Sequence, residues 1–218
     1  MRGSTKGHEG DFDALAFWRG LGGHKTYMRS YGEGVGTASR EWLLTQIKDG
    51  ESLLDVGCGP GCTYENLKVN GRQVTYRGLD FCPEFVAACR ELFPEGDFRQ
   101  GDAMALDEAD NSWDTVLLRH VLEHAPGYRD PIAEAVRVAR KRVVIVMWRP
   151  LSKGPDRMRV AGRTGGSNDF NASDFLCYLN TFVLPITRAE FGGRRPNWAW
   201  VLHKTLGECV FDLDDYHD

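Results

Sequence analysis

The sequence has no long apolar run, and its longest wholly apolar stretch extends only from Val143 to Trp148. A helix that spans a bilayer needs about 20 predominantly apolar residues, so this stretch is too short to serve as one. Residues 1–13 are polar and lack the apolar centre of a secretory signal peptide. We therefore expect a chain that works in the cytoplasm and has no membrane partner.

Positive charge is also scarce. Lys and Arg number 27 against 31 Asp and Glu, which gives a net charge of −4 and a pI near 5.9. Proteins dedicated to binding nucleic acid duplexes are normally basic, so a nucleic-acid partner is disfavoured. Apolar residues make up 42% and charged residues 27% of the 218 residues, which is usual for one folded domain, or one domain with a small cap.

Cysteine is scattered rather than arranged in a framework. In a chain of this size without a signal peptide, reduced thiols fit better than structural disulfides. The cysteines are Cys58, Cys62, Cys82, Cys89, Cys177 and Cys209.

Short apolar runs alternate with amphipathic stretches along most of the chain. Strands that alternate with helices form parallel βαβ units, and the near-continuous apolar run at 142–148 is typical of a central strand buried on both faces. We expect helices at 37–48, 62–69, 84–93, 131–140 and 172–182. We expect strands at 52–56, 74–79, 98–100, 115–118, 142–148, 186–191 and 198–203.

The fold class that follows is α/β, with a doubly wound, mostly parallel seven-stranded sheet and an antiparallel hairpin at its edge. We expect residues 1–36 to form an N-terminal cap segment, 37–206 the main domain and 207–218 an acidic tail. Residues 149–171 interrupt the alternation with a long aperiodic stretch. Loops of this length are usually lids or binding loops, so this one is expected to be a lid or an acceptor loop.

A glycine-rich turn follows the first expected strand. Asp55 lies in that strand, Gly57 and Gly59 lie in the turn, and Asp80 and Asp102 come at the ends of the next two strands. In a doubly wound sheet, ligands bind beyond the carboxyl ends of the strands, so these segments should meet at one site. Glycine allows the backbone to approach a ligand closely, and the carboxylate at position 80 can accept the hydroxyls of a ribose.

The class of ligand follows from two departures from a dinucleotide-binding pattern. Cys62 stands where that pattern needs its third glycine, and Asp55 would oppose a pyrophosphate. A carboxylate there suits a cationic ligand, and S-adenosylmethionine (SAM) carries an ammonium and a sulfonium but no phosphate. Phe81 would lie against the adenine ring, and Asp102 would accept from its amino group. The residues therefore favour SAM over NAD.

These motifs resemble those of the class I SAM-dependent methyltransferases, and within them the methyltransferase type 11 group. The matching stretches are Leu-Leu-Asp-Val-Gly-Cys-Gly-Pro-Gly (53–61), Gly-Leu-Asp (78–80), Gly-Asp-Ala (101–103) and Asp-Thr-Val-Leu-Leu-Arg-His-Val-Leu-Glu-His (114–124), within residues 37–150. The resemblance implies a Rossmann-like methyltransferase domain over 37–206. It also implies that the methionine moiety binds near 55–61, the ribose at 80 and the adenine at 102–103. The implied cofactor-binding residues are Asp55, Gly57, Cys58, Gly59, Gly61, Asp80, Phe81, Asp102, Ala103 and Arg119.

His120, Glu123 and His124 would share one face of a helix. Such a face can hold a divalent metal, and the same string occurs in inverted zinc peptidases. The peptidase reading is disfavoured because the motif follows an apolar strand and soon meets Pro126. Some metal-dependent O-methyltransferases carry a similar string, whereas ordinary members of the group show Leu-Glu-His without metal. We expect no metal, with Glu123 and His124 supporting a helix start and the wall of the site.

The expected reaction is the in-line transfer of a methyl group from SAM to a small molecule. The resemblance implies that Arg119 and His120 border the reacting groups. His120 is the candidate general base because an imidazole titrates near neutrality, and a base is needed only if the acceptor must lose a proton.

The arginines of the 149–171 segment favour an anionic acceptor, although a solvated surface loop would explain the same charges. The candidate acceptor residues are Arg149, Arg157, Arg159, Arg163, Tyr27 and Tyr31. Two alternatives stay open. One is an RNA or protein methyltransferase, supported only by Arg194, Arg195 and the 149–163 segment, and the other is a non-catalytic SAM-binding sensor or partner subunit.

Overall fold

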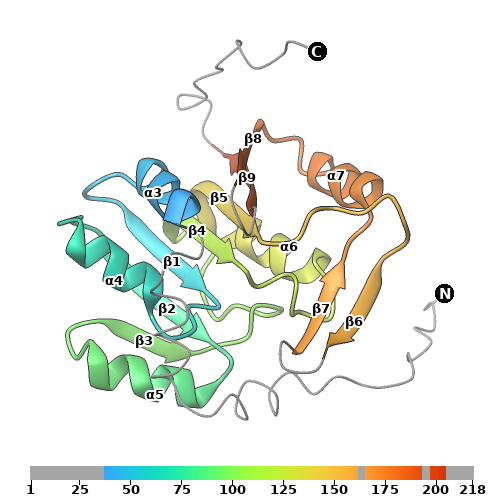
Figure 1. The fold of residues 1–218 in the computed structure, drawn as a ribbon. Coiled ribbons are helices and arrows are strands. Elements are labelled where there is room, and N and C mark those ends of the chain that lie inside the picture. The colour runs from blue at the N-terminus through green and yellow to red at the C-terminus, as the bar shows by residue number, and fades with distance from the viewer. Residues whose placement is uncertain (1–36, 162–164, 193–196, 205–218) are drawn as a thin grey trace.

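The computed structural model describes residues 37–161, 165–192 and 197–204, which fold around a seven-stranded sheet (Figure 1). The strand order is β3-β2-β1-β4-β5-β9-β8. Strands β1 to β5 are parallel to their neighbours, and β9 and β8 extend the sheet as an antiparallel pair beside β5. The bounds are β1 Ser52–Val56, β2 Thr75–Asp80, β3 Asp97–Gln100, β4 Trp113–Arg119, β5 Ala139–Met147, β8 Ile186–Phe191 and β9 Asn197–His203. The predicted fold class is confirmed.

The alternating side chains of the central strands divide the core into two layers. In β5, Val143 and Ile145 belong to one buried cluster, while Val144 and Val146 belong to the other, and all four are fully buried. Successive side chains of a strand point to opposite faces, so only a continuous apolar run can supply both layers. Each such side chain contributes about 1.5–3 kcal/mol by leaving water.

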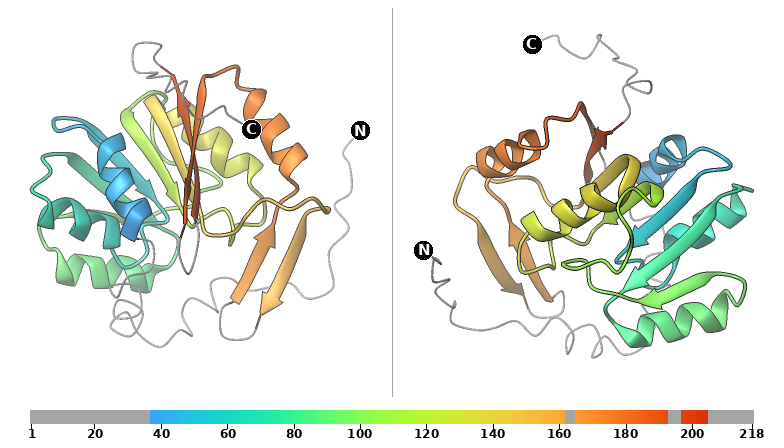
Figure 2. Two further views of the ribbon diagram at one scale, coloured as in Figure 1. Left: turned by 45° about the horizontal axis from the view of Figure 1, so that its top comes forward. Right: turned by 180° about the vertical axis from the view of Figure 1, so that it is seen from behind.

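Helices cover both faces of the sheet (Figure 2). Helices α3 (Thr37–Gln46), α4 (Cys62–Val69) and α5 (Pro83–Leu92) supply buried residues to the cluster around Val144. Helices α6 (Arg129–Val138) and α7 (Ala172–Asn180) supply those of the cluster around Val143. No helix in the described ranges is long and apolar enough to cross a bilayer.

Ion pairs tie together the amino-terminal ends of the central strands. Arg142 donates to the buried Glu51 at 2.6 Å, and Arg140 donates to Asp114 at 2.8 Å. The Asp114 carboxylate also accepts the backbone N–H of Ser52 at 3.0 Å. Burial alone would raise the pKa of Asp114, but the hydrogen bonds from Ser52 and Arg140 lower it to about 2. The ion pairs at the amino-terminal ends of the strands therefore contribute to stability. The carboxyl ends of the strands remain available for a ligand.

The stretch 149–171 contains a second, two-stranded sheet, which corrects the prediction of an aperiodic loop. Strands β6 (Arg157–Ala161) and β7 (Gly165–Asp169) pair antiparallel and lie beside the main sheet (Figures 1 and 2). The sequence concealed the hairpin because β7 reads Gly-Gly-Ser-Asn-Asp and has no apolar or β-branched side chain to reveal a strand period. Asn168 fastens β7 to the domain, because its N–H donates to the Glu123 carbonyl at 2.7 Å.

Within the described ranges every cysteine is a free thiol, which matches the expectation for them: Cys58, Cys62, Cys82, Cys89 and Cys177. The expected N-terminal cap segment, the expected acidic tail and Cys209 lie outside the described residues.

Candidate functional site

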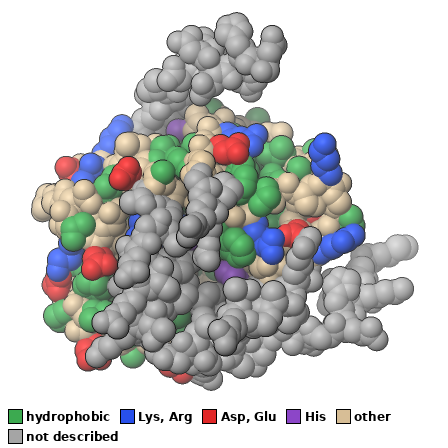
Figure 3. Space-filling view, viewed as in Figure 1, with side chains coloured by type: hydrophobic (Ala, Val, Ile, Leu, Met, Phe, Trp, Pro, Cys, Tyr) green, Lys and Arg blue, Asp and Glu red, His purple; other side chains and the backbone are tan. Residues whose placement is uncertain are grey.

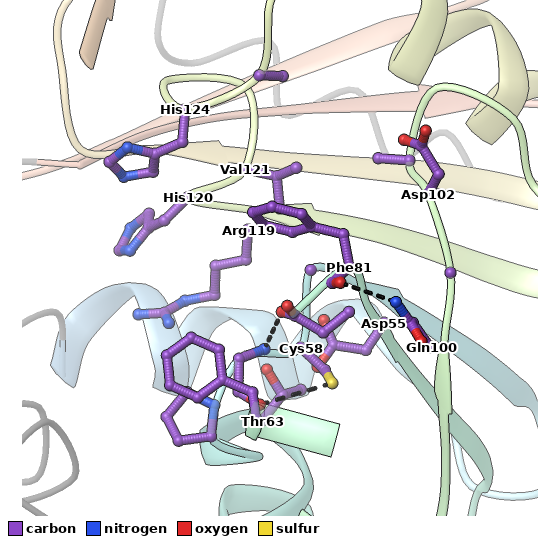
Figure 4. A pocket seen from close by; sticks show the side chains of 18 of the residues that line it. Asp55, Cys58, Thr63, Phe81, Gln100, Asp102, Arg119, His120, Val121 and His124 are labelled. Carbon is purple, nitrogen blue, oxygen red and sulfur yellow. Dashed lines mark hydrogen bonds between the residues drawn. The ribbon is translucent and has the colours of Figure 1, made fainter. Parts of the chain in front are cut away.

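A cavity of about 670 Å³ opens beyond the carboxyl ends of β1, β2, β3 and β4 (Figure 4). Its lining brings together most of the predicted cofactor residues: Asp55, Gly57, Cys58, Gly59, Asp80, Phe81, Asp102, Ala103 and Arg119. His120 lines it as well. The sequence analysis missed further lining residues that follow the same strand ends, among them Thr63, Gln100, Met104, Val121 and Ala125. Their position just after strand ends was a usable signal.

The glycine-rich turn needs glycine for different reasons at its three positions. Gly57 has a φ of +74°, and a Cβ built on it would lie 2.4 Å from Cγ2 of Val121, so any side chain would displace that wall of the cavity. Gly59 has a φ of +52°, and nothing described lies within 4 Å of its Cβ position. Gly61 lies outside the lining, and its Cβ position is 2.9 Å from the ring of Phe93. The close approach of Phe93 therefore explains the need for glycine at position 61, and its predicted cofactor contact stays a prediction.

Asp80 anchors the turn from the end of β2. Its carboxylate accepts the N–H of Gly59 at 2.8 Å and the N–H of Cys82 at 2.9 Å. Only 6% of the residue is exposed. Burial raises the pKa of Asp80 to about 6, against the lowering effect of these two hydrogen bonds. A carboxylate has about four lone-pair directions, so acceptor capacity remains toward the cavity.

Asp55 lies deeper, at the end of β1, with 1% of its surface exposed. The hydroxyl of Tyr76 donates to it at 2.8 Å. Burial raises the pKa of Asp55 to about 6, and the nearby Arg119 guanidinium opposes the rise. Two buried carboxyls with raised pKa values thus face one cavity, an arrangement typical of functional sites rather than of structural ion pairs.

The β2 and β3 ends form a flatter, partly apolar wall. Phe81 is a large apolar side chain that leaves 38% of its surface exposed. The amide of Gln100 donates to the carbonyl of Phe81 at 3.3 Å, and Asp102 accepts the N–H of Met104 at 2.9 Å. An exposed ring beside a solvent-accessible carboxylate can receive a flat heterocycle that carries a hydrogen-bond donor.

His120 follows β4 in an unusual backbone conformation. Its φ is +57°, in the left-handed region that costs a non-glycine residue about 1–3 kcal/mol. Its N–H donates to the Val146 carbonyl at 2.8 Å, and its Nε2 lies 2.7 Å from Oδ1 of Asn197 at the start of β9. Burial lowers the pKa of His120 well below its usual range, and the charge of Arg119 adds to this effect. The imidazole is therefore neutral at neutral pH, which corrects the expectation that it titrates there.

No helix places His120, Glu123 and His124 on one face, the condition for the metal-binding hypothesis, and α6 begins at Arg129. Glu123 is fully buried, lies outside the lining and accepts the N–H of Trp148 at 2.7 Å. Burial raises the pKa of Glu123 to about 7. His124 lines the cavity beside His120 (Figure 4). In the described part of the chain, no three His, Cys, Asp or Glu side chains converge as metal ligands.

The predicted acceptor residues are placed unevenly. Arg149 lies outside the lining, donates to Ser167 at 3.0 Å and pairs with Asp169 at 3.1 Å, so its guanidinium fastens the β6–β7 hairpin. Arg157 is exposed on β6, and Arg159 belongs to the same strand. Tyr27, Tyr31 and Arg163 lie outside the described residues, as do Arg194 and Arg195.

Comparison with known proteins identifies the region around the cavity. Residues 54–147 match the family model described as a methyltransferase domain. The chain is 35% identical over 114 residues to phosphatidylethanolamine N-methyltransferase from Cereibacter sphaeroides. The alignment covers 49% of this chain and 55% of that protein. It is 30% identical over 151 residues to ajmaline N-methyltransferase from Rauvolfia serpentina. That alignment covers 62% of this chain and 50% of that protein. The chain thus spans about half the length of these curated relatives.

A solved structure agrees with this match at the level of the fold. The chain superimposes on 1,6-didemethyltoxoflavin-N1-methyltransferase from Burkholderia thailandensis, bound to 1,6-didemethyltoxoflavin and S-adenosylhomocysteine, with a TM-score of 0.64. The alignment covers 94% of this chain and 93% of that one at 15% sequence identity. This likeness shows a shared fold.

Proposed function

Residues 54–147 form a methyltransferase domain of the class I, SAM-dependent family, and from this premise we propose that the chain transfers the sulfonium methyl group of SAM to a small molecule. One observation carries the proposal. The glycine-rich turn after β1, Asp80 at the end of β2 and Asp102 after β3 surround a single cavity of about 670 Å³. Such convergence at the carboxyl ends of parallel strands is how doubly wound folds build ligand sites.

The residues fit SAM by their chemistry. Asp80 has acceptor capacity for ribose hydroxyls, and the exposed ring of Phe81 offers a surface for adenine. The open space at the Cβ position of Gly59 allows a ligand to approach the backbone closely. The buried Asp55 carboxyl favours a cationic ligand over a pyrophosphate.

When bound, SAM supplies a methyl group already activated by the positive charge on sulfur. The chain's own task is to align the acceptor with that methyl group and to exclude water. Val121, Ala125 and Pro126 give the wall after β4 an apolar character suited to excluding water. Arg119, the neutral His120 and His124 are polar side chains of the same wall that can orient an acceptor.

A small acceptor is supported by the surface and by the relatives. On the described part of the face in Figure 3, basic and acidic side chains are interspersed. The curated relatives are named for phosphatidylethanolamine and ajmaline, neither of which is a nucleic acid or a protein. Of the arginines that favour an anionic acceptor, Arg149 already pairs with Asp169, whereas Arg157 is exposed on β6.

The test combines binding and transfer. Calorimetry should detect SAM binding, and methyl-labelled SAM incubated with a metabolite extract should yield a labelled low-mass product by mass spectrometry. Asp80→Asn should reduce both signals, while Asp130→Asn, an exposed position of α6 outside the lining, should change neither. Label in an RNA or protein fraction would replace the small-molecule acceptor, and SAM binding without transfer to any fraction would favour a non-catalytic sensor. Absence of SAM binding would refute the proposal.

A further inference from the structure

We propose that Asn197 is a positioning residue that holds the proton of the His120 imidazole on Nε2, so that Nδ1 keeps the lone pair that accepts a proton from the methyl acceptor. This inference rests on the proposed methyltransferase function and specifies one of its steps. It also sets the class of acceptor, which is a hydroxyl or an N–H group rather than a tertiary amine. No sequence motif pointed to position 197.

The topology explains how a residue of the last described strand reaches the site. Because β9 runs antiparallel to β5, the first residue of β9 lies level with the carboxyl ends of the parallel strands. The next residue, Trp198, pairs with Met147, the last residue of β5. His120 reaches the same place from β4, since its N–H donates to the carbonyl of Val146 in β5. The two side chains, 77 positions apart in the sequence, meet across the end of β5 at 2.7 Å.

The chemistry of this contact fixes the tautomer. A carboxamide oxygen only accepts hydrogen bonds, so Nε2 facing Oδ1 of Asn197 must carry the proton. Nδ1 then holds the lone pair. Nδ1 is shielded from solvent and has no hydrogen-bond partner among the described residues. Asn197 is itself 3% exposed, so bulk water does not compete for its oxygen.

The surroundings keep the imidazole in the neutral state that this role needs. Arg119 of β4, His124 of the following loop and Arg40 of α3 all bring positive charge toward His120, and burial adds to their effect in lowering its pKa. The left-handed backbone at His120 is a second, independent sign that the ring is held in place, because strained residues of this kind concentrate at functional sites.

The proton-transfer step balances as follows. The bond from the acceptor atom to the methyl carbon forms while the sulfur–methyl bond breaks, and its electron pair stays on sulfur. The acceptor's proton moves to Nδ1, which leaves a His120 imidazolium, and the ring loses this proton to water that enters the cavity after the product has left. A tertiary amine has no proton to give and would make the arrangement superfluous.

The direct test is nuclear magnetic resonance of ¹⁵N-labelled histidine in the ligand-free protein, with the His120 signals assigned through His120→Gln. We expect a neutral ring protonated on Nε2 alone in the wild type. Asn197→Leu, which removes the acceptor at similar volume, should shift the population toward protonation on Nδ1. Asn197→Asp should retain the Nε2 proton and raise the pKa of His120, because a carboxylate stabilises the imidazolium.

A matched control lies at the other end of the same hairpin. His203 Nε2 and Thr187 Oγ1 are 3.1 Å apart, so Thr187→Val should alter the His203 signals and leave those of His120 unchanged. This separates loss of the Asn197 contact from general loosening of β8 and β9. A wild-type ring protonated on Nδ1, which is what the opposite orientation of the Asn197 amide would produce, overturns the proposal. An unchanged tautomer in Asn197→Leu overturns the proposal as well. If Asn197→Leu does not fold, the tautomer of the wild type and the pKa of His120 in Asn197→Asp still test the proposal.

Transfer kinetics, with labelled SAM and the acceptor identified by the metabolite screen, provide the second readout. Asn197→Leu should lower kcat about 10²- to 10⁴-fold. SAM affinity should stay within about twofold, since cofactor contacts lie elsewhere, and Asn197→Asp should restore much of kcat with its acidic limb moved to higher pH. An unchanged kcat in Asn197→Leu overturns the proposal even where methyl transfer itself is established. Absence of any transfer refutes the proposed function alone, because the tautomer measurement does not depend on it.

Discussion

Replacement of Asp80 by Asn separates ligand binding from folding at the centre of the cavity. The substitution keeps the size of the side chain and one acceptor oxygen, but removes the charge. We expect SAM affinity to fall at least tenfold at pH 7.5 while the fold is retained. Ribose hydroxyls that donate to a charged acceptor contribute about 1.5–3 kcal/mol each, so the loss of one such bond accounts for the effect.

The effect on folding follows from the buried carboxyl. Burial raises the pKa of Asp80 from 3.8 to about 6, so its contribution to stability is fully present below pH 3.8 and is lost as the pH rises through 6. At neutral pH the ionised group therefore destabilises the free protein by ~3 kcal/mol. Asn removes this cost but leaves the N–H of Gly59 or Cys82 without its acceptor, which costs about 1–3 kcal/mol. The two changes nearly cancel.

Two measurements test this reasoning. Calorimetric titration of SAM from pH 5 to 8 should show affinity that falls below pH 6 in the wild type and a flatter profile in Asp80→Asn. Asp55 also has a pKa of about 6, and the Asp80 charge contributes to raising it, so the difference between the profiles reports the Asp80 carboxyl together with its effect on Asp55. Asp130→Asn is the matched control. Unchanged SAM affinity in Asp80→Asn at pH 7.5, with a native thermal transition, would refute the assignment of the ribose to this residue.

Four further outcomes are expected. Phe81→Ala should weaken SAM binding by about 1–3 kcal/mol if the ring stacks on adenine, whereas Leu176→Ala, at a similarly exposed apolar position, should leave the calorimetric affinity unchanged. Gly57→Ala should lower Tm by several degrees in calorimetric scans, because its Cβ would overlap Val121, and a native Tm would contradict this close approach of the turn to Val121. Asp114→Asn should destabilise the protein by ~2 kcal/mol at pH 7 in urea titrations, and the wild-type advantage should vanish as the pH falls from 4 to 2. Methyl transfer should survive EDTA, and a loss that added divalent metal restores would show a metal requirement.

The topology and most of the cavity lining could be predicted because local patterns determine them. A strand that ends in a glycine-rich turn fixes where Asp55 and Gly59 lie. The parallel pairing of β1 with β2 then brings Asp80 to the same end of the sheet. The sequence could not show that Gly61, unlike Gly57 and Gly59, lies outside the cavity lining. Its role depends on Phe93, which approaches it from the far end of α5.

Other features depend on contacts between distant segments and left little trace in the sequence. Spacing suggested a helix through Glu123, but Trp148 and Asn168 take up its polar groups and hold the segment as a turn. The β6–β7 hairpin is fastened by Arg149 and Asp169, so charge that suggested an acceptor site is used for packing. The orientation of His120 is set by Asn197, and no local pattern connects the two.

The antiparallel course of β9 has a consequence for how the site is assembled. Every described residue that lines the cavity comes from positions 55–126, so this part of the site is encoded by one continuous stretch that is synthesised before β9. The contact that orients His120 arrives only with the hairpin that closes the exposed edge of β5. The cavity, His120 included, and the residue proposed to position His120 are therefore encoded in separate parts of the chain. Changes in the closing hairpin can alter which acceptors react while the nucleoside cradle remains as it was.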